Sequence, residues 1–123
     1  MAKVLVIEDE QDLREIIVAE LEDLGHRTIQ AVDGEQGLQK TLNDNPDIIV
    51  ADINMPKMSG HQLRGHLQKN HPEHAKIPFM FLSALADPAD IADGMMVGVD
   101  HYLTKPVNFD MLQGWINDLT RGR

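Results

Sequence analysis

Short apolar runs recur along this chain, and each predicts a β-strand. Residues 4–7 and 48–51 are unbroken and rich in β-branched side chains, which is typical of strands buried on both faces. The stretch 28–32 instead alternates between apolar and polar residues, which favours a strand at the edge of a sheet. Five strands are predicted in all, at residues 4–7, 28–32, 48–51, 79–82 and 102–104.

Between these runs, apolar residues recur at the three- and four-residue spacing of amphipathic helices. In the first such stretch they fall at positions 13, 16, 17, 21 and 24, and Gly25 marks its end. In the last stretch the inward positions are 109, 112, 116 and 119. Five helices are predicted, at residues 12–24, 35–43, 61–69, 88–96 and 108–119.

The strict alternation of strands and helices predicts an α/β fold, a doubly wound parallel sheet with helices on both faces. In open sheets of this kind, ligands bind beyond the carboxyl ends of the strands. The residues that follow each apolar run are therefore the candidates for chemistry.

Composition narrows the class of protein. The 123 residues fit one domain, and 20 acidic against 11 basic side chains give a net charge of −9. That acidity argues against sequence-independent nucleic-acid binding, and the lack of cysteine excludes disulfides and thiolate sites. With neither a secretory signal nor a long apolar run, we expect a single soluble, intracellular domain without membrane insertion.

Charged residues do follow the predicted strands. Glu8 and Asp9 come after the first, Asp52 comes after the third, and Lys105 follows the fifth. If these side chains meet, three carboxylates and one lysine leave a charge of −2, which a divalent cation would neutralise. An all-oxygen site suits Mg²⁺, and an aspartate can accept a phosphoryl group covalently.

Taken in order, these features resemble the receiver domain of bacterial response regulators, over essentially the whole chain. No single motif is specific, but each one ends a predicted strand. The motifs are Glu8-Asp9, the segment Asp52-Ile53-Asn54-Met55-Pro56 with Gly60 beyond it, Ser83-Ala84, and Tyr102-Leu103-Thr104-Lys105-Pro106.

The resemblance implies a flavodoxin-like sheet with strand order 2-1-3-4-5 and a role for each site residue. Asp52 would accept the phosphoryl group, with Mg²⁺ held by Glu8, Asp9, Asp52 and the backbone carbonyl of Asn54. Lys105 and Ser83 would contact the phosphoryl oxygens, Ser83 and Tyr102 would act as switch residues, and the Lys105–Pro106 peptide bond would be cis.

The resemblance also implies a signalling switch of a two-component phosphorelay rather than a metabolic enzyme. The phosphoryl donor would be a histidine kinase or a phosphotransfer protein in the cytoplasm. An output partner, or a second copy, would bind the face formed by the fourth helix, fifth strand and fifth helix. Residues 1–123 would be one receiver domain, without an output domain in this chain.

Two other functions stay open at this point. One is a small Mg²⁺-dependent phosphohydrolase with an aspartyl nucleophile, as in haloacid-dehalogenase-like proteins; that family has a second Asp where this chain has Asn54. The other is an interaction module on the same fold that works without phosphorylation, against which the intact acids and Lys105 argue.

The remaining unusual residues receive structural interpretations. Six histidines include the pairs His61/His66 and His71/His74, but residues 71–76 are expected to form a surface loop, and we expect no histidine metal site. Met111, like Met95 and Met96, is expected to fill a gap in the core. Trp115 lies at the margin of its helix's buried stripe, where a partner could reach it.

Overall fold

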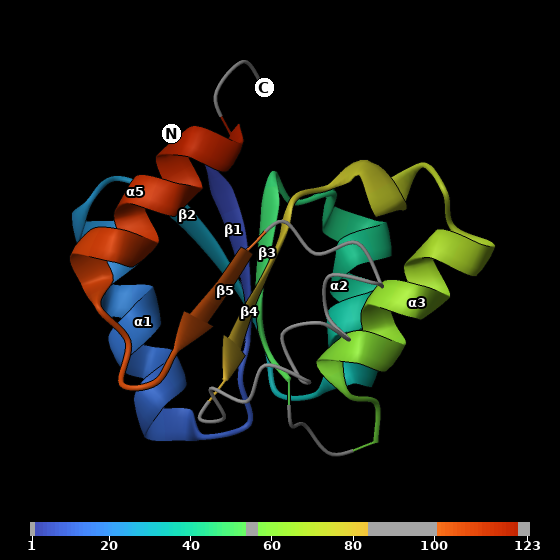
Figure 1. Cartoon of the computed structure of the whole chain (residues 1–123), viewed down its shortest axis with the longest axis horizontal. Helices are drawn as coiled ribbons and strands as arrows, with labels where there is room; N and C mark the ends of the chain where they lie inside the picture. Colours follow the sequence, from blue (N-terminus) through green and yellow to red (C-terminus); the bar gives the residue numbers. More distant parts are fainter. Residues whose placement is uncertain (1, 54–56, 84–100, 121–123) are drawn as a thin grey trace.

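The computed structural model describes residues 2–53, 57–83 and 101–120, and these form one parallel sheet flanked by helices (Figure 1). The sheet has five strands in the order β2-β1-β3-β4-β5. All neighbouring strands are parallel, which confirms the predicted fold class and strand order. The strands are β1 (Lys3–Ile7), β2 (Arg27–Ala31), β3 (Ile48–Asp52), β4 (Phe79–Ser83) and β5 (His101–Thr104).

Helices cover both faces of this sheet. Helices α1 and α5 lie on one face, and α2 and α3 lie on the other (Figure 1). The predicted helix 88–96 lies outside the described residues. The helices are α1 (Gln11–Asp23), α2 (Gly34–Asp44), α3 (Gly60–Asn70) and α5 (Phe109–Thr120), with a short 3₁₀ helix η1 (His74–Lys76) before β4.

Because successive strand residues point to opposite faces, the central strands contribute to two separate cores. On β1, Val4 and Val6 pack with α1 and α5, whereas Leu5 and Ile7 pack on the side of α2 and α3. All four side chains are fully buried. This two-sided burial explains why the strands read as unbroken apolar runs.

Local signals set several element boundaries. The Asp33 side chain caps α2 by accepting from the Gln36 N–H, and Ser59 with Gln62 forms a capping box at the start of α3. Gly25 follows α1 with a φ of 92°, which favours glycine. The predicted elements within the described residues are confirmed to within one residue at each end.

One expectation was wrong. Met111 is 51% exposed rather than buried, because the inward stripe of α5 is centred on Leu112 and Ile116, and position 111 points away from it. The segment 71–76 lies at the surface, as expected, and contains the three-residue helix η1. Within the described residues, no helix is long and apolar enough to cross a membrane.

Candidate functional site

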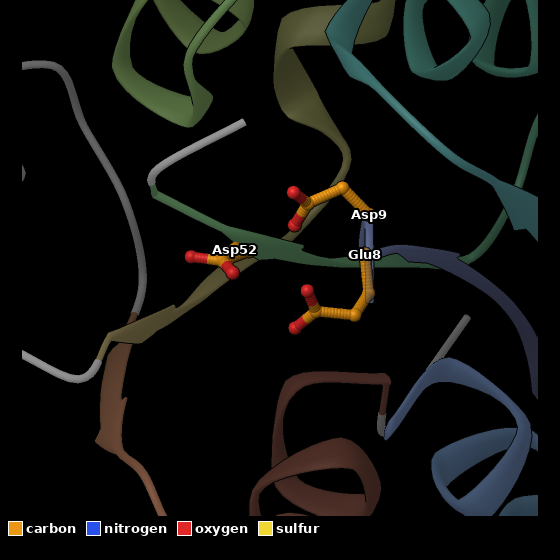
Figure 2. A group of neighbouring side chains, drawn as sticks. All are labelled: Glu8, Asp9 and Asp52. Carbon is orange, nitrogen blue, oxygen red and sulfur yellow. The ribbon is translucent and has the colours of Figure 1, made fainter. Parts of the chain in front are cut away.

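Three carboxylates meet at the carboxyl edge of the sheet. Glu8 and Asp9 directly follow β1, and Asp52 ends the neighbouring strand β3. The register pairs Ile7 with Ala51, so the next residues on both strands lie side by side. Figure 2 shows the three side chains turned toward a common space. One carboxylate oxygen from each lies within 4.8 Å of the others.

Lys105 brings the only cation that an ion pair links to these carboxylates among the described residues. Its Nζ lies 2.8 Å from Asp52 Oδ2 and 2.9 Å from Glu8 Oε1. The lysine side chain is 16% exposed, whereas Glu8 is fully buried and Asp52 is 5% exposed. The pairs are thus largely screened from solvent, and Lys105 holds the Asp52 carboxylate in a defined orientation.

Glu8 is buried in an environment that favours its protonated form. Burial raises the pKa of Glu8 to about 7, and the nearby charge of Asp52 adds to the rise. The hydrogen bond and charge of Lys105, together with the Glu10 N–H that donates to Glu8 Oε2 at 3.2 Å, act in the opposite direction. Glu8 therefore changes charge near neutral pH.

Lys105 is held in its charged form. Burial by itself lowers the pKa of this lysine, but hydrogen bonds to Asp52 and Glu8, together with their negative charges, outweigh it. The pKa of Lys105 consequently rises above its usual value. A permanent positive charge beside Asp52 is what a phosphoryl group arriving there would need.

The donor set fits Mg²⁺. The three acids offer oxygen atoms, which are the ligands that Mg²⁺ prefers. Mg²⁺ in proteins is usually bound directly by one or two carboxylates, and water molecules fill its remaining positions. With all acids ionised, Lys105 offsets one of three negative charges. Asp9 is exposed and Asp52 nearly buried, so an ion between them would keep access to water.

The amino end of α3 packs against the backbone at the end of β3, a contact that the sequence did not reveal. A Cβ added at Gly60 would lie 3.0 Å from the Asp52 carbonyl oxygen and 2.9 Å from the Phe81 ring. The Gly60 N–H also donates to Ile53 O at 3.0 Å. The sequence showed a glycine at position 60, beyond Asp52, but not the close packing that requires a residue without a side chain there.

The remaining predicted site residues differ in how far they are described. Ser83 is the last residue of β4, next to the strand of Asp52 and opposite Thr104 of β5, and its side chain lies outside the description. Asn54 also lies outside the described residues. Tyr102 is half-buried, with its ring edge-on to Phe81 at 5.4 Å between centroids. The Lys105–Pro106 bond is cis, as predicted.

Comparison with known proteins agrees with this geometry. The model of the response regulator receiver domain matches residues 4–117. The chain belongs to this family. The receiver domain of Francisella response regulator 1452 superposes with a TM-score of 0.91 at 34% identity, covering 98% of both chains. The receiver domain of a histidine kinase from Syntrophus aciditrophicus superposes with a TM-score of 0.89 at 30% identity. The superposition covers 99% of this chain and 92% of the other.

Curated relatives are regulators with additional sequence. The transcriptional regulatory protein DltR of Streptococcus agalactiae is 35% identical over 97% of this chain, which corresponds to 52% of DltR. The gliding motility regulatory protein of Myxococcus xanthus is 39% identical over 84% of this chain and 13% of its own length. The chain thus spans about half, or less, of the curated relatives it matches.

Family membership establishes the general role. Receiver domains are signalling modules of two-component response regulators, not classical enzymes, and a phosphorylation switch is general among them. They generally bind Mg²⁺ at an acidic pocket, and this chain has such a cluster in Glu8, Asp9 and Asp52.

Proposed function

We propose that Asp52 accepts a phosphoryl group from the phosphohistidine of a histidine kinase or phosphotransfer protein. The observation that carries this proposal is the pairing of Asp52 with Lys105 at 2.8 Å, beside two further carboxylates at the carboxyl edge of the sheet. A nucleophile, a fixed cation and an all-oxygen metal site then occupy one crevice, which phosphoryl transfer requires.

In the proposed step, an Asp52 carboxylate oxygen attacks phosphorus while the bond from phosphorus to the donor's imidazole nitrogen breaks. The imidazole leaves with that electron pair and takes up a proton. Lys105, already beside Asp52, offsets the negative charge that the phosphoryl oxygens bring. Removal of the group is hydrolysis: water attacks phosphorus, the bond from phosphorus to the Asp52 oxygen breaks, the carboxylate leaves with that electron pair, and inorganic phosphate and a proton pass to solvent.

Glu8, Asp9 and Asp52 would hold Mg²⁺, with the carbonyl of Asn54 as a further ligand. The ion would supply positive charge for the three phosphoryl oxygens. Of the acids, exposed Asp9 can reach an ion with the least loss of hydration, whereas buried Glu8 must first lose its proton near neutral pH.

The switch would pass from Asp52 to the surface through the neighbouring strands. Ser83 ends the next strand, and we propose that its hydroxyl contacts the new phosphoryl oxygens. Tyr102 lies one strand further and packs on Phe81, whose position on β4 is two residues before Ser83. A shift of β4's end would therefore change the room available to the Tyr102 ring.

The proposed output surface is the face formed by β5, α5 and the helix predicted from the sequence at residues 88–96. Trp115 on α5 packs partly against the core that includes Leu112 and Ile116, so a change in β5 can reach its surface position. The partner would be an output domain, another protein or a second copy. We propose a cytoplasmic location, where a kinase with access to ATP would act, and one receiver domain over residues 1–123.

The test of Asp52 is stoichiometric labelling. The protein is incubated with acetyl phosphate and Mg²⁺, and its intact mass is measured. We expect one added phosphoryl group in the parent and none in Asp52→Asn. Asp12→Asn removes an exposed carboxylate from the first turn of the adjacent α1 and should label like the parent. Labelling of Asp52→Asn would refute the assignment.

A turnover assay with simple phosphomonoesters tests the first of the two other functions considered, and the labelling experiment tests the second. A phosphohydrolase would turn over simple phosphomonoesters many times per chain, whereas a switch would take up one group. An interaction module independent of phosphorylation would remain unlabelled. The Asn54 position, where haloacid-dehalogenase-like proteins have Asp, favours the switch.

A further inference from the structure

Three histidines gather at the carboxyl end of α3. His66 lies on the last turns of α3, His71 is its C-cap and His74 begins η1. The ring centroids of His66 and His71 are 5.5 Å apart, and those of His71 and His74 are 6.3 Å apart. From the sequence we expected no histidine metal site and noted His71 with His74, but His66 only with His61. The proximity of His66 and His71 arises only when the chain turns at the end of the helix.

We propose that His66, His71 and His74 bind a divalent transition-metal ion of borderline softness, such as Zn²⁺, Ni²⁺ or Cu²⁺. Imidazole nitrogen is a preferred ligand for these ions and a poor one for Mg²⁺, which favours oxygen. The site would thus differ in chemistry from the acidic crevice at Asp52. It is independent of the proposed phosphorylation.

The ring separations can be compared with those of a metal-bound pair. A Zn–N bond of about 2.0–2.1 Å places the ring centre about 3.2 Å from the ion, so two rings at a tetrahedral angle have centres about 5.2 Å apart. His66 and His71, at 5.5 Å, are already near that separation. His71 and His74, at 6.3 Å, must approach by about 1 Å on the same tetrahedral geometry.

Binding also includes rotation of the rings. Within the described part of the chain, the acidic group is the one set of three residues whose ligand atoms all lie within 4.8 Å. His66, His71 and His74 are half-buried rather than enclosed, so their side chains have room to turn. His66 and His71 therefore form the initial chelate, and His74 completes it.

Asparagines contact both outer rings, and the contact at His74 is of the kind that metal ligands usually make. Asn45 Oδ1 lies 2.9 Å from His74 Nε2, so Nε2 carries the proton and Nδ1 keeps its lone pair. Asn70 Nδ2 donates to His66 Nδ1 at 3.2 Å and to the His66 carbonyl at 3.3 Å, so Nε2 carries the proton in this arrangement. Ligation through Nε2 would move that proton to Nδ1, and a half-turn of the Asn70 amide would then present its oxygen to Nδ1.

The location favours a cation and is remote from the acidic crevice. The last carbonyls of a helix carry partial negative charge, and His71 caps that end of α3. The exposed side chains of Lys69 and Lys76 oppose this effect, while Glu73 supports it. The segment leads into the first residue of β4, so the cluster lies at the amino edge of the sheet, opposite the edge of Asp52 (Figure 1).

The test titrates Zn²⁺ or Ni²⁺ into the full chain with Mg²⁺ saturating, followed by calorimetry and by the imidazole proton shifts. We expect one ion per chain, with shifts confined to the three histidines. The double variant His66→Gln/His71→Gln should bind at least tenfold more weakly, and His74→Gln should weaken binding less. His61→Gln, a histidine outside the cluster, and Asp52→Asn should both bind like the parent.

Several results would overturn the proposal. It is wrong if the parent binds neither ion below millimolar concentration, or if the double variant binds as tightly as the parent. It is also wrong if Asp52→Asn removes the binding, because the ion would then occupy the acidic crevice. Circular dichroism of each variant verifies that a loss of binding is not a loss of fold.

Discussion

Replacement of Glu8 by glutamine should make the protein more stable, and the gain should depend on pH. Glu8 is fully buried, with the negative charge of Asp52 beside it. Glutamine has almost the same shape but never ionises. It therefore imitates the protonated glutamic acid, which is the form that this environment favours.

The size of the effect follows from the pKa. The pKa of Glu8 rises from 4.5 to about 7 on folding, and each unit corresponds to about 1.4 kcal/mol, so the ionised carboxylate costs on the order of 3 kcal/mol. Between these two values the folded protein binds more protons than the unfolded chain. Its stability therefore falls as pH rises through this window and is level above it.

The assay is urea unfolding of the parent and Glu8→Gln at pH 4.5 and pH 8, without divalent ions. At pH 4.5 the two free energies of unfolding should nearly agree. At pH 8 the variant should be more stable by up to about 3 kcal/mol, which moves its midpoint by about 1–3 M urea. Glu20→Gln, an exposed position on α1, serves as the matched control.

A difference between parent and Glu8→Gln that is the same at both pH values would refute this reasoning. So would a variant that is less stable than the parent at pH 8, because the ion pair with Lys105 would then outweigh the cost of burial. The control should show no comparable change with pH.

Three more outcomes are expected. Mg²⁺ affinity should rise up to about tenfold between pH 6 and pH 8 as Glu8 ionises, because a ligand must be deprotonated; calorimetry in matched buffers measures it. Gly65→Ala should stabilise the protein by up to about 1 kcal/mol, since a Cβ there meets nothing within 4 Å. Gly34→Ala should destabilise the protein, because the added carbon would clash with the Met58 carbonyl oxygen; thermal unfolding compares the two variants. Phe81→Ala should cost about 3–5 kcal/mol in urea unfolding, because its buried ring packs in the core beside α3.

The elements of this fold were predictable because their signals are local. An unbroken run such as 48–51 marks a strand buried on both faces, and Ser59 and Gly25 lie at helix ends for reasons of backbone hydrogen bonding and φ. The parallel sheet followed from the alternation of strands and helices. The strand order came instead from the resemblance to receiver domains, because no local pattern encodes which strands become neighbours.

Tertiary structure decided what the local pattern left open. The sequence placed Glu8, Asp52 and Lys105 after strands, but only the register of β1 with β3 and the position of β5 bring Lys105 within 2.9 Å of both acids. The pKa of Glu8 depends on burial by parts of the chain far from it in sequence.

The exposure of single side chains also depends on the tertiary structure and not on residue type alone. Met111 is apolar and adjacent to a buried stripe, yet it is exposed, because a turn of 100° per residue separates it from Leu112. His66 and His71 meet because α3 ends between them. Composition and periodicity by themselves determined the class of fold and the candidate chemistry, since both depend on residue type and spacing. Distance, burial and charge state were decided by packing, since each depends on neighbours that only the folded chain supplies.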